Sequence, residues 1–462
     1  MSKACADRPG GNRRPQPWPW GKPLGQVLLA ALLLFAWPVA LAWSAEPGVD
    51  NATMDLDFDI PEVEKKLFEF GGYLEARETV LGLNKHSLLY RQKYAGQQTA
   101  DQQFVTNLAG KLEGKAQTGI ASAYARFKLG GQKDVADGWV WDNTFEEAFV
   151  ALKPSPSVTL EAGKRVMKWG KGYAWNPAGF VSRPKDPNDP EETLEGYGML
   201  NADLIKSFDG PLQTIAFTPV VIPVTDFGNT EWGKRGSFVG AAKLYFLFMD
   251  TDIDLMLLAG ESTTTRAGLD FSKNITSDFE VHGESAVEFD APRSITDSQG
   301  NLRQEKLNAW SHLLGVRYLN SYDTTFIFEY YRNGLGYSRS EMKDYYSFVQ
   351  SALGSFSGGN PAPLKKSKNY GLTYNLQSAM QDYLYLRISQ KEPFDILYFT
   401  PALTSIYNMD DRSFSISPEL VYSPTTNLEF RLKTMLTFGG ADTEYGEKIN
   451  SSKTELRLRY YF

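Results

Sequence analysis

The segment from residue 160 to residue 190 carries the densest group of charged side chains with a distinctive setting. It reads LEAGKRVMKWGKGYAWNP and continues to RPKDPNDP, with the cations Lys164, Arg165, Lys168, Lys171 and Arg183. Gly170 and Gly172 permit backbone conformations that other residues avoid, and the prolines stiffen the chain that follows. We predict that the loop after Trp169 folds inward, where these cations form a constriction that concentrates anions. A purely structural external loop is the alternative.

Side chains suited to catalysis are scarce. The three histidines are His86, His282 and His312, and no spacing to serine or aspartate distinguishes any of them as a general base. Phosphate-binding glycine loops, HExxH and calcium loops are absent from the sequence. We therefore predict no catalytic residues, no metal and no cofactor. A hydrolase at the rim, using one of these histidines, is a minor alternative.

The first 45 residues have the composition of a secretory signal peptide. A basic lead precedes an apolar run, and Ala42 or Ala45 offers a cleavage position. Pro38 inside the run argues against a membrane anchor. The one cysteine, Cys5, falls in this segment, so the remaining chain is predicted to lack disulfides, thiolate metal sites and a cysteine nucleophile.

Residues 46–66 are acidic and are expected to form a periplasmic extension or an inner plug, while residues 67–462 form the main domain. The net charge of the full chain is −7, and it becomes more negative once the basic leader is removed. Nucleic acid is therefore not an expected partner.

The C-terminal sequence SKTELRLRYYF alternates strictly between two kinds of side chain. Apolar or aromatic residues stand at Leu456, Leu458, Tyr460 and Phe462, and charged residues stand at Glu455, Arg457 and Arg459. This pattern resembles the C-terminal strand of outer-membrane β-barrels. The resemblance implies that Leu458, Tyr460 and Phe462 are a signal for the barrel-assembly machinery and that the chain is embedded in outer-membrane lipid.

The same alternation recurs along the chain and predicts an all-β fold. One apolar face and one charged face per strand is typical of a transmembrane antiparallel barrel, and it explains why the mean hydropathy is only −0.36. We expect about 18 strands, with 16 as the alternative, joined by short periplasmic turns and long extracellular loops. The expected strands are 67–79, 103–115, 118–130, 143–153, 157–169, 196–208, 212–223, 237–249, 252–263, 266–273, 277–290, 307–320, 322–333, 368–378, 382–392, 413–423, 427–439 and 453–462.

Charges on the presumed inner faces are segregated. Basic residues that we expect to line a pore are Arg126, Arg387, Arg431, Arg457 and Arg459, whereas the strand at 277–290 is acidic. Such segregation is expected for a pore with a transverse field, and structural ion pairs account for it equally well.

The segment from Gly163 to Pro177 contains the pattern G-K-x-x-x-x-W-G…N-P. It resembles a stretch found in porin-like barrels of the alginate-export type and in related uncharacterised 18-stranded families. The resemblance implies an outer-membrane pore and no particular substrate. We expect this pore to serve the passage or export of small hydrophilic or anionic solutes. Two other roles remain open: a sheath around a partner such as a cytochrome, or a docking barrel for a periplasmic export complex.

Overall fold

The computed structural model describes residues 67–134, 138–226, 228–374 and 376–462. The expected signal peptide at 1–45 and the segment 46–66 lie outside the described residues.

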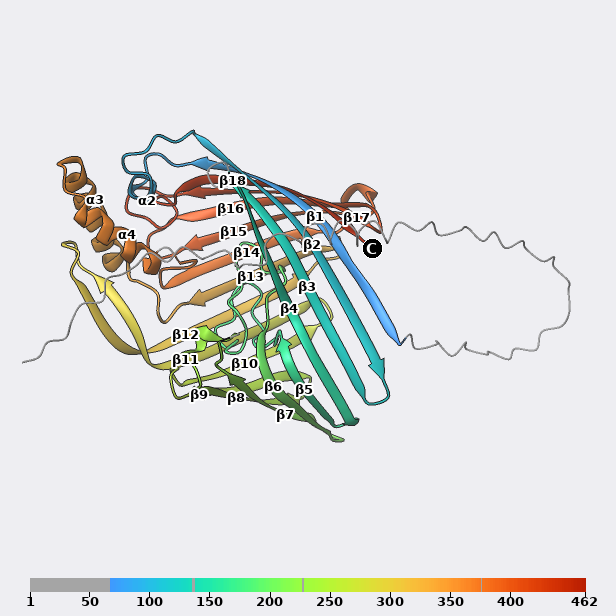
Figure 1. The fold of residues 1–462 in the computed structure, drawn as a ribbon. Helices are drawn as coiled ribbons and strands as arrows, with labels where there is room; N and C mark the ends of the chain where they lie inside the picture. Colours follow the sequence, from blue (N-terminus) through green and yellow to red (C-terminus); the bar gives the residue numbers. More distant parts are fainter. Residues whose placement is uncertain (1–66, 135–137, 227, 375) are drawn as a thin grey trace, which may run out of the picture. The chain divides into compact units, whose positions relative to one another are not determined.

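Eighteen antiparallel strands form a single closed barrel (Figure 1). Each strand pairs with the next in sequence, and β18 pairs with β1, which closes the ring. The strands are β1 Phe68–Leu83, β2 Gln102–Thr118, β3 Ala121–Asp134, β4 Gly138–Ser155, β5 Val158–Arg165, β6 Tyr197–Ser207, β7 Leu212–Pro223, β8 Phe238–Phe248, β9 Thr251–Gly260, β10 Arg266–Thr276, β11 Phe279–Thr296, β12 Leu302–Leu319, β13 Thr324–Arg332, β14 Asp382–Gln390, β15 Phe399–Asn408, β16 Phe414–Thr425, β17 Leu428–Phe438 and β18 Asn450–Tyr461. The predicted barrel and its strand number are confirmed.

The closing seam joins the two ends of the barrel sequence. Tyr73 lies opposite Tyr461, and the pairing continues without a break to Gly82 opposite Ser452. Beyond the ladder, the Phe462 N–H donates to the Gly72 carbonyl at 3.1 Å and the Gly72 N–H donates back at 3.2 Å. The C-terminal residue therefore completes the ring of backbone hydrogen bonds.

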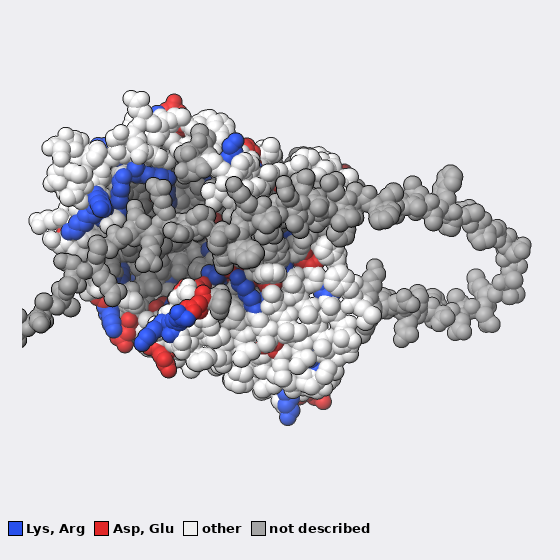
Figure 2. Space-filling model, in the orientation of Figure 1, with Lys and Arg blue, Asp and Glu red and all other residues white. Residues whose placement is uncertain are grey.

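Side chains alternate between the outer surface and the lumen as the sequence predicts. On β18, Leu456, Leu458 and Tyr460 are exposed on the outside, whereas Glu455 and Arg457 are buried inside. Figure 2 shows an outer wall with few charged side chains over much of the visible face. A closed barrel with this apolar exterior is the architecture of bacterial outer-membrane proteins, and it confirms the predicted class and location.

The strand count is right because two errors cancel. The strand predicted at 368–378 is wrong, since helix α4 (Ala362–Tyr374) covers most of it. Strand β15 was missed, since residues 393–412 were predicted to be a loop. Pro401 weakened the strand pattern there, but the ladder to β14 ends at Ala402, so β14 needs no hydrogen bond from Pro401.

Two predicted long loops are also shorter than expected. Strand β3 ends at residue 134 and β4 begins at residue 138. Strand β11 ends at residue 296 and β12 begins at residue 302. The loops predicted at 131–142 and 291–306 are therefore mostly strand.

The joins still differ between the two ends. At the end we call the short-turn end, seven of the eight joins contain two to four residues, and the eighth is 391–398, with the 3-10 turn η2 (Pro393–Asp395). The opposite, long-loop end carries α2 (Leu88–Lys93), η1 (Thr230–Trp232), α3 (Arg339–Ser357), α4 and the loop 166–196. No helix among the described residues is long and apolar enough to cross a membrane.

Helices α3 and α4 pack at the long-loop end. Ser338 caps α3 with a capping box to Glu341, which satisfies the free amides of its first turn. Tyr374 of α4 stacks on Tyr337 and on Tyr345 of α3, with ring centroids 4.2 Å apart in both pairs. The same apolar cluster includes Trp175 of the 166–196 loop, so the helices and the loop form one packed unit.

Candidate functional site

The connection between β5 and β6, residues 166–196, folds into the barrel, and we call it the lumen loop. Its residues contact side chains that point inward from β9, β11, β13, β17 and β18. The loop therefore crosses the lumen from the acidic strands to the basic ones, and it is the candidate functional site.

Two carboxylates of the wall hold the backbone of the lumen loop. Glu284 on β11 accepts the N–H groups of Lys171 and Gly172 through Oε1, both at 2.6 Å, and that of Ala178 through Oε2 at 2.9 Å. Glu329 on β13 accepts the N–H groups of Tyr173 and Ala174. Both oxygens of each carboxyl group accept backbone N–H groups, so the clamp holds the loop at five amides.

Glycine is required where the loop meets Glu284. Gly170 has φ +88°, and a Cβ there would lie 2.9 Å from the Glu284 carboxylate. At Gly172 a Cβ would lie 2.1 Å from the Trp175 carbonyl oxygen. The two glycines singled out in the sequence thus allow the backbone to approach the clamp.

Trp175 anchors the same part of the loop through its ring. It stacks on Tyr331 of β13 at 4.9 Å between centroids, and its Nε1 donates to the Ser378 hydroxyl at 2.9 Å. Tyr383 and Tyr385 of β14 complete the aromatic contacts. Such pairs add roughly 0.5–1.5 kcal/mol each beyond the area that they bury.

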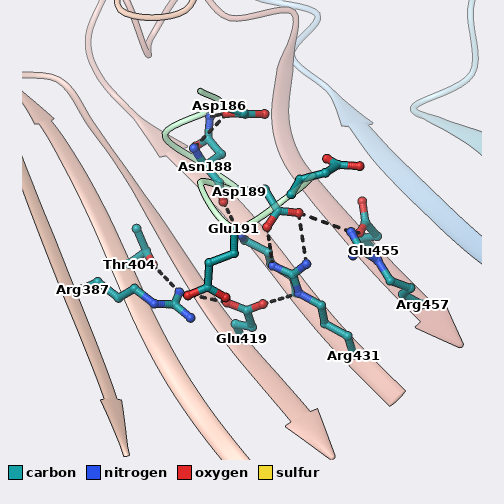
Figure 3. A network of polar contacts seen from close by, with 12 residues as sticks. Asp186, Asn188, Asp189, Glu191, Arg387, Thr404, Glu419, Arg431, Glu455 and Arg457 are labelled. Carbon is teal, nitrogen blue, oxygen red and sulfur yellow. Dashed lines mark hydrogen bonds and ion pairs between the residues drawn. The ribbon is translucent and has the colours of Figure 1, made fainter. Parts of the chain in front are cut away.

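The far side of the lumen loop binds arginines (Figure 3). Asp189 accepts two hydrogen bonds from Arg431 of β17, at 2.9 and 3.0 Å, and one from Arg457 of β18 at 3.3 Å. Glu419 of β16 pairs with Arg431 and with Arg387 of β14. The loop's carboxylate therefore joins a network of arginines and acids on the basic wall.

The arginines change the ionisation of Asp189. Its burial alone would raise the pKa, but the hydrogen bonds from Arg431 and the charges of Arg431, Lys433 and Arg457 outweigh that effect and lower the pKa to about 2. Asp189 is therefore ionised throughout the physiological pH range.

Most of the loop cations named in the sequence are paired with acids. Lys171 lies 3.1 Å from Asp254 of β9, Arg183 lies 2.9 Å from Glu231, and Lys164 pairs with Glu195 and Arg165 with Glu161. Lys168 is exposed and forms no ion pair with any of the described residues. Whether the five form a selective constriction stays a prediction, and the structure shows that four of their charges are partly balanced.

The wall arginines named in the sequence point into the lumen. Arg387, Arg431, Arg457 and Arg459 line one cavity, whereas Arg126 lies beside Glu146 and Glu147 and lines another. Opposite them, Asp254, Asp270, Glu284 and Glu329 are buried on β9, β10, β11 and β13. The wall that carries the arginines also carries Glu419, Glu429 and Glu455, which pair with them. The lumen loop joins the two walls, because Lys171 lies beside Asp254 and Asp189 lies beside Arg431.

Three adjoining cavities follow the lumen past the loop. One of about 610 Å³ lies toward the short-turn end, one of about 580 Å³ lies within the loop, and one of about 460 Å³ lies toward the long-loop end. The first two share Glu191, Glu192 and Thr193 in their walls, and the last two share Arg183 and Lys185 among others. Their sizes are those of small-molecule sites.

Cations outnumber carboxylates in the walls of the central cavity. Five cations line it, against three carboxylates: Arg126, Lys168, Lys171, Arg183 and Lys185 against Glu147, Glu191 and Glu192. Four of these five cations were predicted from the sequence to line the pore, and Lys185, another cation of the same loop, was not assigned to it. It donates to the carbonyls of Gly172 and Tyr173, at 2.7 and 3.2 Å.

Sequence reasoning also missed Asp189 and assigned no role to Glu284 and Glu329 beyond their facing the lumen. The repeated Asp-Pro pairs of RPKDPNDP were a signal that acids share the loop with its cations. No local pattern indicates which wall residue accepts a loop amide, because the partners are more than 100 positions apart.

His282 and His312 have different surroundings. His282 is buried and its Nε2 lies 2.9 Å from Glu329, so it belongs to the clamp. His312 is on the outer surface, where it stacks on Trp310 and its Nδ1 lies 3.0 Å from the Ser285 hydroxyl. No carboxylate among the described residues forms an ion pair with His312, whereas His282 lies beside both Glu280 and Glu329.

No protein-family model matches the chain, and no curated protein matches it. Among solved structures, it is similar to Pseudomonas aeruginosa OccK5 (OpdH), with 12% identity, 85% of this chain and 98% of that chain covered, and a TM-score of 0.49. It is also similar to Pseudomonas aeruginosa OprD, with 10% identity, 85% of this chain and 95% of that chain covered, and a TM-score of 0.46. A triple mutant of the Rhodopseudomonas blastica porin is similar with 9% identity, 86% of this chain and 100% of that chain covered, and a TM-score of 0.42.

Proposed function

We propose that this protein is an outer-membrane channel for small hydrophilic solutes, with a preference for anions, and that the lumen loop forms its narrow section. The observation that carries the proposal is the series of three adjoining cavities on both sides of the loop and within it. Cations outnumber carboxylates in the walls of each of the three. In a confined space with low-dielectric walls, that excess concentrates anions.

The acidic net charge of the chain does not oppose this preference. Charges separated from the solute by more than about 10 Å are largely screened at 0.1 M salt, so the side chains at the narrow section decide selectivity. Lys168 is the most informative of them, because it lines the central cavity and its charge is not balanced by an ion pair within the described residues.

The alternative of a sheath around a partner protein has less support. The lumen loop crosses the barrel, and helices α3 and α4 pack with it at the long-loop end. The cavities that remain have the volume of small solutes rather than of a protein. Docking of a periplasmic partner at the short-turn end stays a prediction.

The test is the reversal potential of the purified protein in a planar bilayer under a salt gradient. We expect an anion preference in the native channel and a smaller one in Lys168→Glu. Lys171→Glu is expected to shift selectivity in the same direction, and it also places a second acid beside Asp254. Lys234→Glu, in an exposed loop outside the three cavities, is the matched control. A native cation preference, or unchanged selectivity in Lys168→Glu, would exclude the loop from the conduction path.

A further inference from the structure

The turn between β14 and β15 differs from every other join at the short-turn end. It has eight residues, KEPFDILY at 391–398, where the other seven joins have two to four. Its apolar side chains are outside: Phe394 is 90% exposed, Leu397 66% and Tyr398 60%. Apolar side chains exposed to water would not stabilise a turn, so this composition indicates an apolar surrounding.

The backbone holds these side chains outward in an unusual conformation. Phe394, Asp395 and Tyr398 have φ of 61°, 58° and 57°, a region that bulky residues rarely adopt. Hydrogen bonds maintain it: the Glu392 N–H donates to the Phe399 carbonyl at 2.8 Å, and the Ser423 N–H of β16 donates to the Tyr398 carbonyl at 3.1 Å. Strain of this kind persists only where the surroundings impose it.

The turn bends over the outer face of the barrel rather than continuing the strands. Ile396 contributes to a groove of about 310 Å³ together with Leu420 and Tyr422 of β16 and Phe430 and Leu432 of β17, among others. These β16 and β17 residues are exposed on the outer wall, and they alternate with the lumen residues Glu419 and Arg431. The groove is therefore part of the apolar exterior.

We propose that the 391–398 turn is embedded in the lipid leaflet at the short-turn end and that a phospholipid acyl chain occupies the groove beneath it. The groove is continuous with the apolar wall that lipid covers, and every side chain that lines it is apolar or aromatic. Lys391 and Glu392 place charge where the turn begins and Asp395 lies within it, so the turn is suited to the level where the headgroups begin. The turn thus anchors the barrel at the membrane interface, independently of solute passage.

Single-cysteine labelling tests this proposal directly, because residues 67–462 contain no cysteine. Phe394→Cys, Leu397→Cys and Ile396→Cys, each made in a Cys5→Ser chain, would carry a single fluorophore and be reconstituted in phospholipid vesicles with and without brominated acyl chains. We expect bromine to quench all three labels. Thr426→Cys, exposed in the neighbouring two-residue turn between β16 and β17, is the control and is expected to respond mainly to a water-soluble quencher.

Each variant is first checked for the native shift in electrophoretic mobility on heating, which reports a folded barrel. Labels at 394 and 397 that behave like the label at 426 would overturn the proposal and would place the turn in water, free for a protein partner. Quenching at 394 and 397 without quenching at 396 would overturn the occupied groove. Because none of these residues lines a lumen cavity, a failed channel assay would leave this result standing.

Discussion

Asp189 of the lumen loop accepts two hydrogen bonds from Arg431 of β17, at 2.9 and 3.0 Å, across 242 positions of sequence. Glu284 holds the other end of the same loop through three backbone amides. The loop is therefore fixed at both walls, by its backbone on the acidic side and by a side chain on the basic side.

Asp189→Asn tests the arginine contact. Removing the charge weakens two hydrogen bonds from Arg431, worth about 1.5–3 kcal/mol each, and it leaves Arg431 and Arg457 with less counter-charge. We expect stronger anion selectivity, measured as reversal potential. Asp186→Asn is the control, because Asp186 accepts hydrogen bonds from Asn188 and from no arginine among the described residues. Equal shifts in both variants would contradict the assignment.

The same contact predicts a pH dependence. The pKa of Asp189 falls from its ordinary value of 3.8 to about 2 in the folded protein. A carboxylate with a lowered pKa contributes its stabilisation fully above the ordinary value, and that contribution is lost as the pH falls through the folded value. We expect the Asp189 contribution to selectivity to be constant from pH 8 to about 4 and to disappear toward pH 2. In Asp189→Asn this change should be smaller when reversal potential is followed against pH, because the other carboxylates of the same cavity remain.

Glu284→Gln tests the backbone clamp. Gln presents one N–H₂ group where the carboxylate presented an oxygen, so at least one loop amide loses its acceptor. A loss of about 1.5–3 kcal/mol corresponds to roughly tenfold to hundredfold faster hydrogen exchange at Lys171, Gly172 or Ala178. Glu429→Gln, a lumen residue bonded to Tyr461 and not to the loop, should leave that exchange unchanged. Unchanged exchange in Glu284→Gln would mean that the clamp does not hold the loop.

Leu432→Arg and Lys433→Arg test the orientation of neighbouring residues. Leu432 is on the apolar exterior, and an arginine there should destabilise the barrel by about 2–4 kcal/mol if it lies at the bilayer midplane. Lys433 faces the lumen and donates to the Asn188 carbonyl, so arginine at 433 should cost far less. Urea unfolding in vesicles measures both. Equal costs would mean that the register is wrong.

Phe462→Ser tests the closing strand. The Phe462 ring lies 6.1 Å from that of Phe70, and the Phe462 backbone completes the seam with Gly72. We expect much less protein inserted in the outer membrane, with normal export across the inner membrane, measured by fractionation and heat modifiability. Phe438→Ser, at the end of β17, is the control for loss of an exposed ring. Normal insertion of Phe462→Ser would contradict an assembly signal at this position.

The sequence alone determined the barrel and the orientation of most strands. Alternation has a period of two, and it is a local property that each strand carries regardless of its partners. The change from the charged Glu455 to the apolar Leu456 therefore indicated the lumen and lipid faces without any knowledge of the neighbouring strands.

Tertiary contacts decided where local patterns were ambiguous. Residues 362–374 became a helix because Leu364, Ser367 and Tyr374, at helical spacing, are buried together at the long-loop end. Likewise, β15 is a strand despite Pro401, because β16 supplies its ladder there. The sequence listed the cations of the lumen loop, but only the closed barrel brought Lys171 to Asp254 and Asp189 to Arg431. Those pairs depend on which strands face each other across the lumen, and this is a property of the ring rather than of any segment.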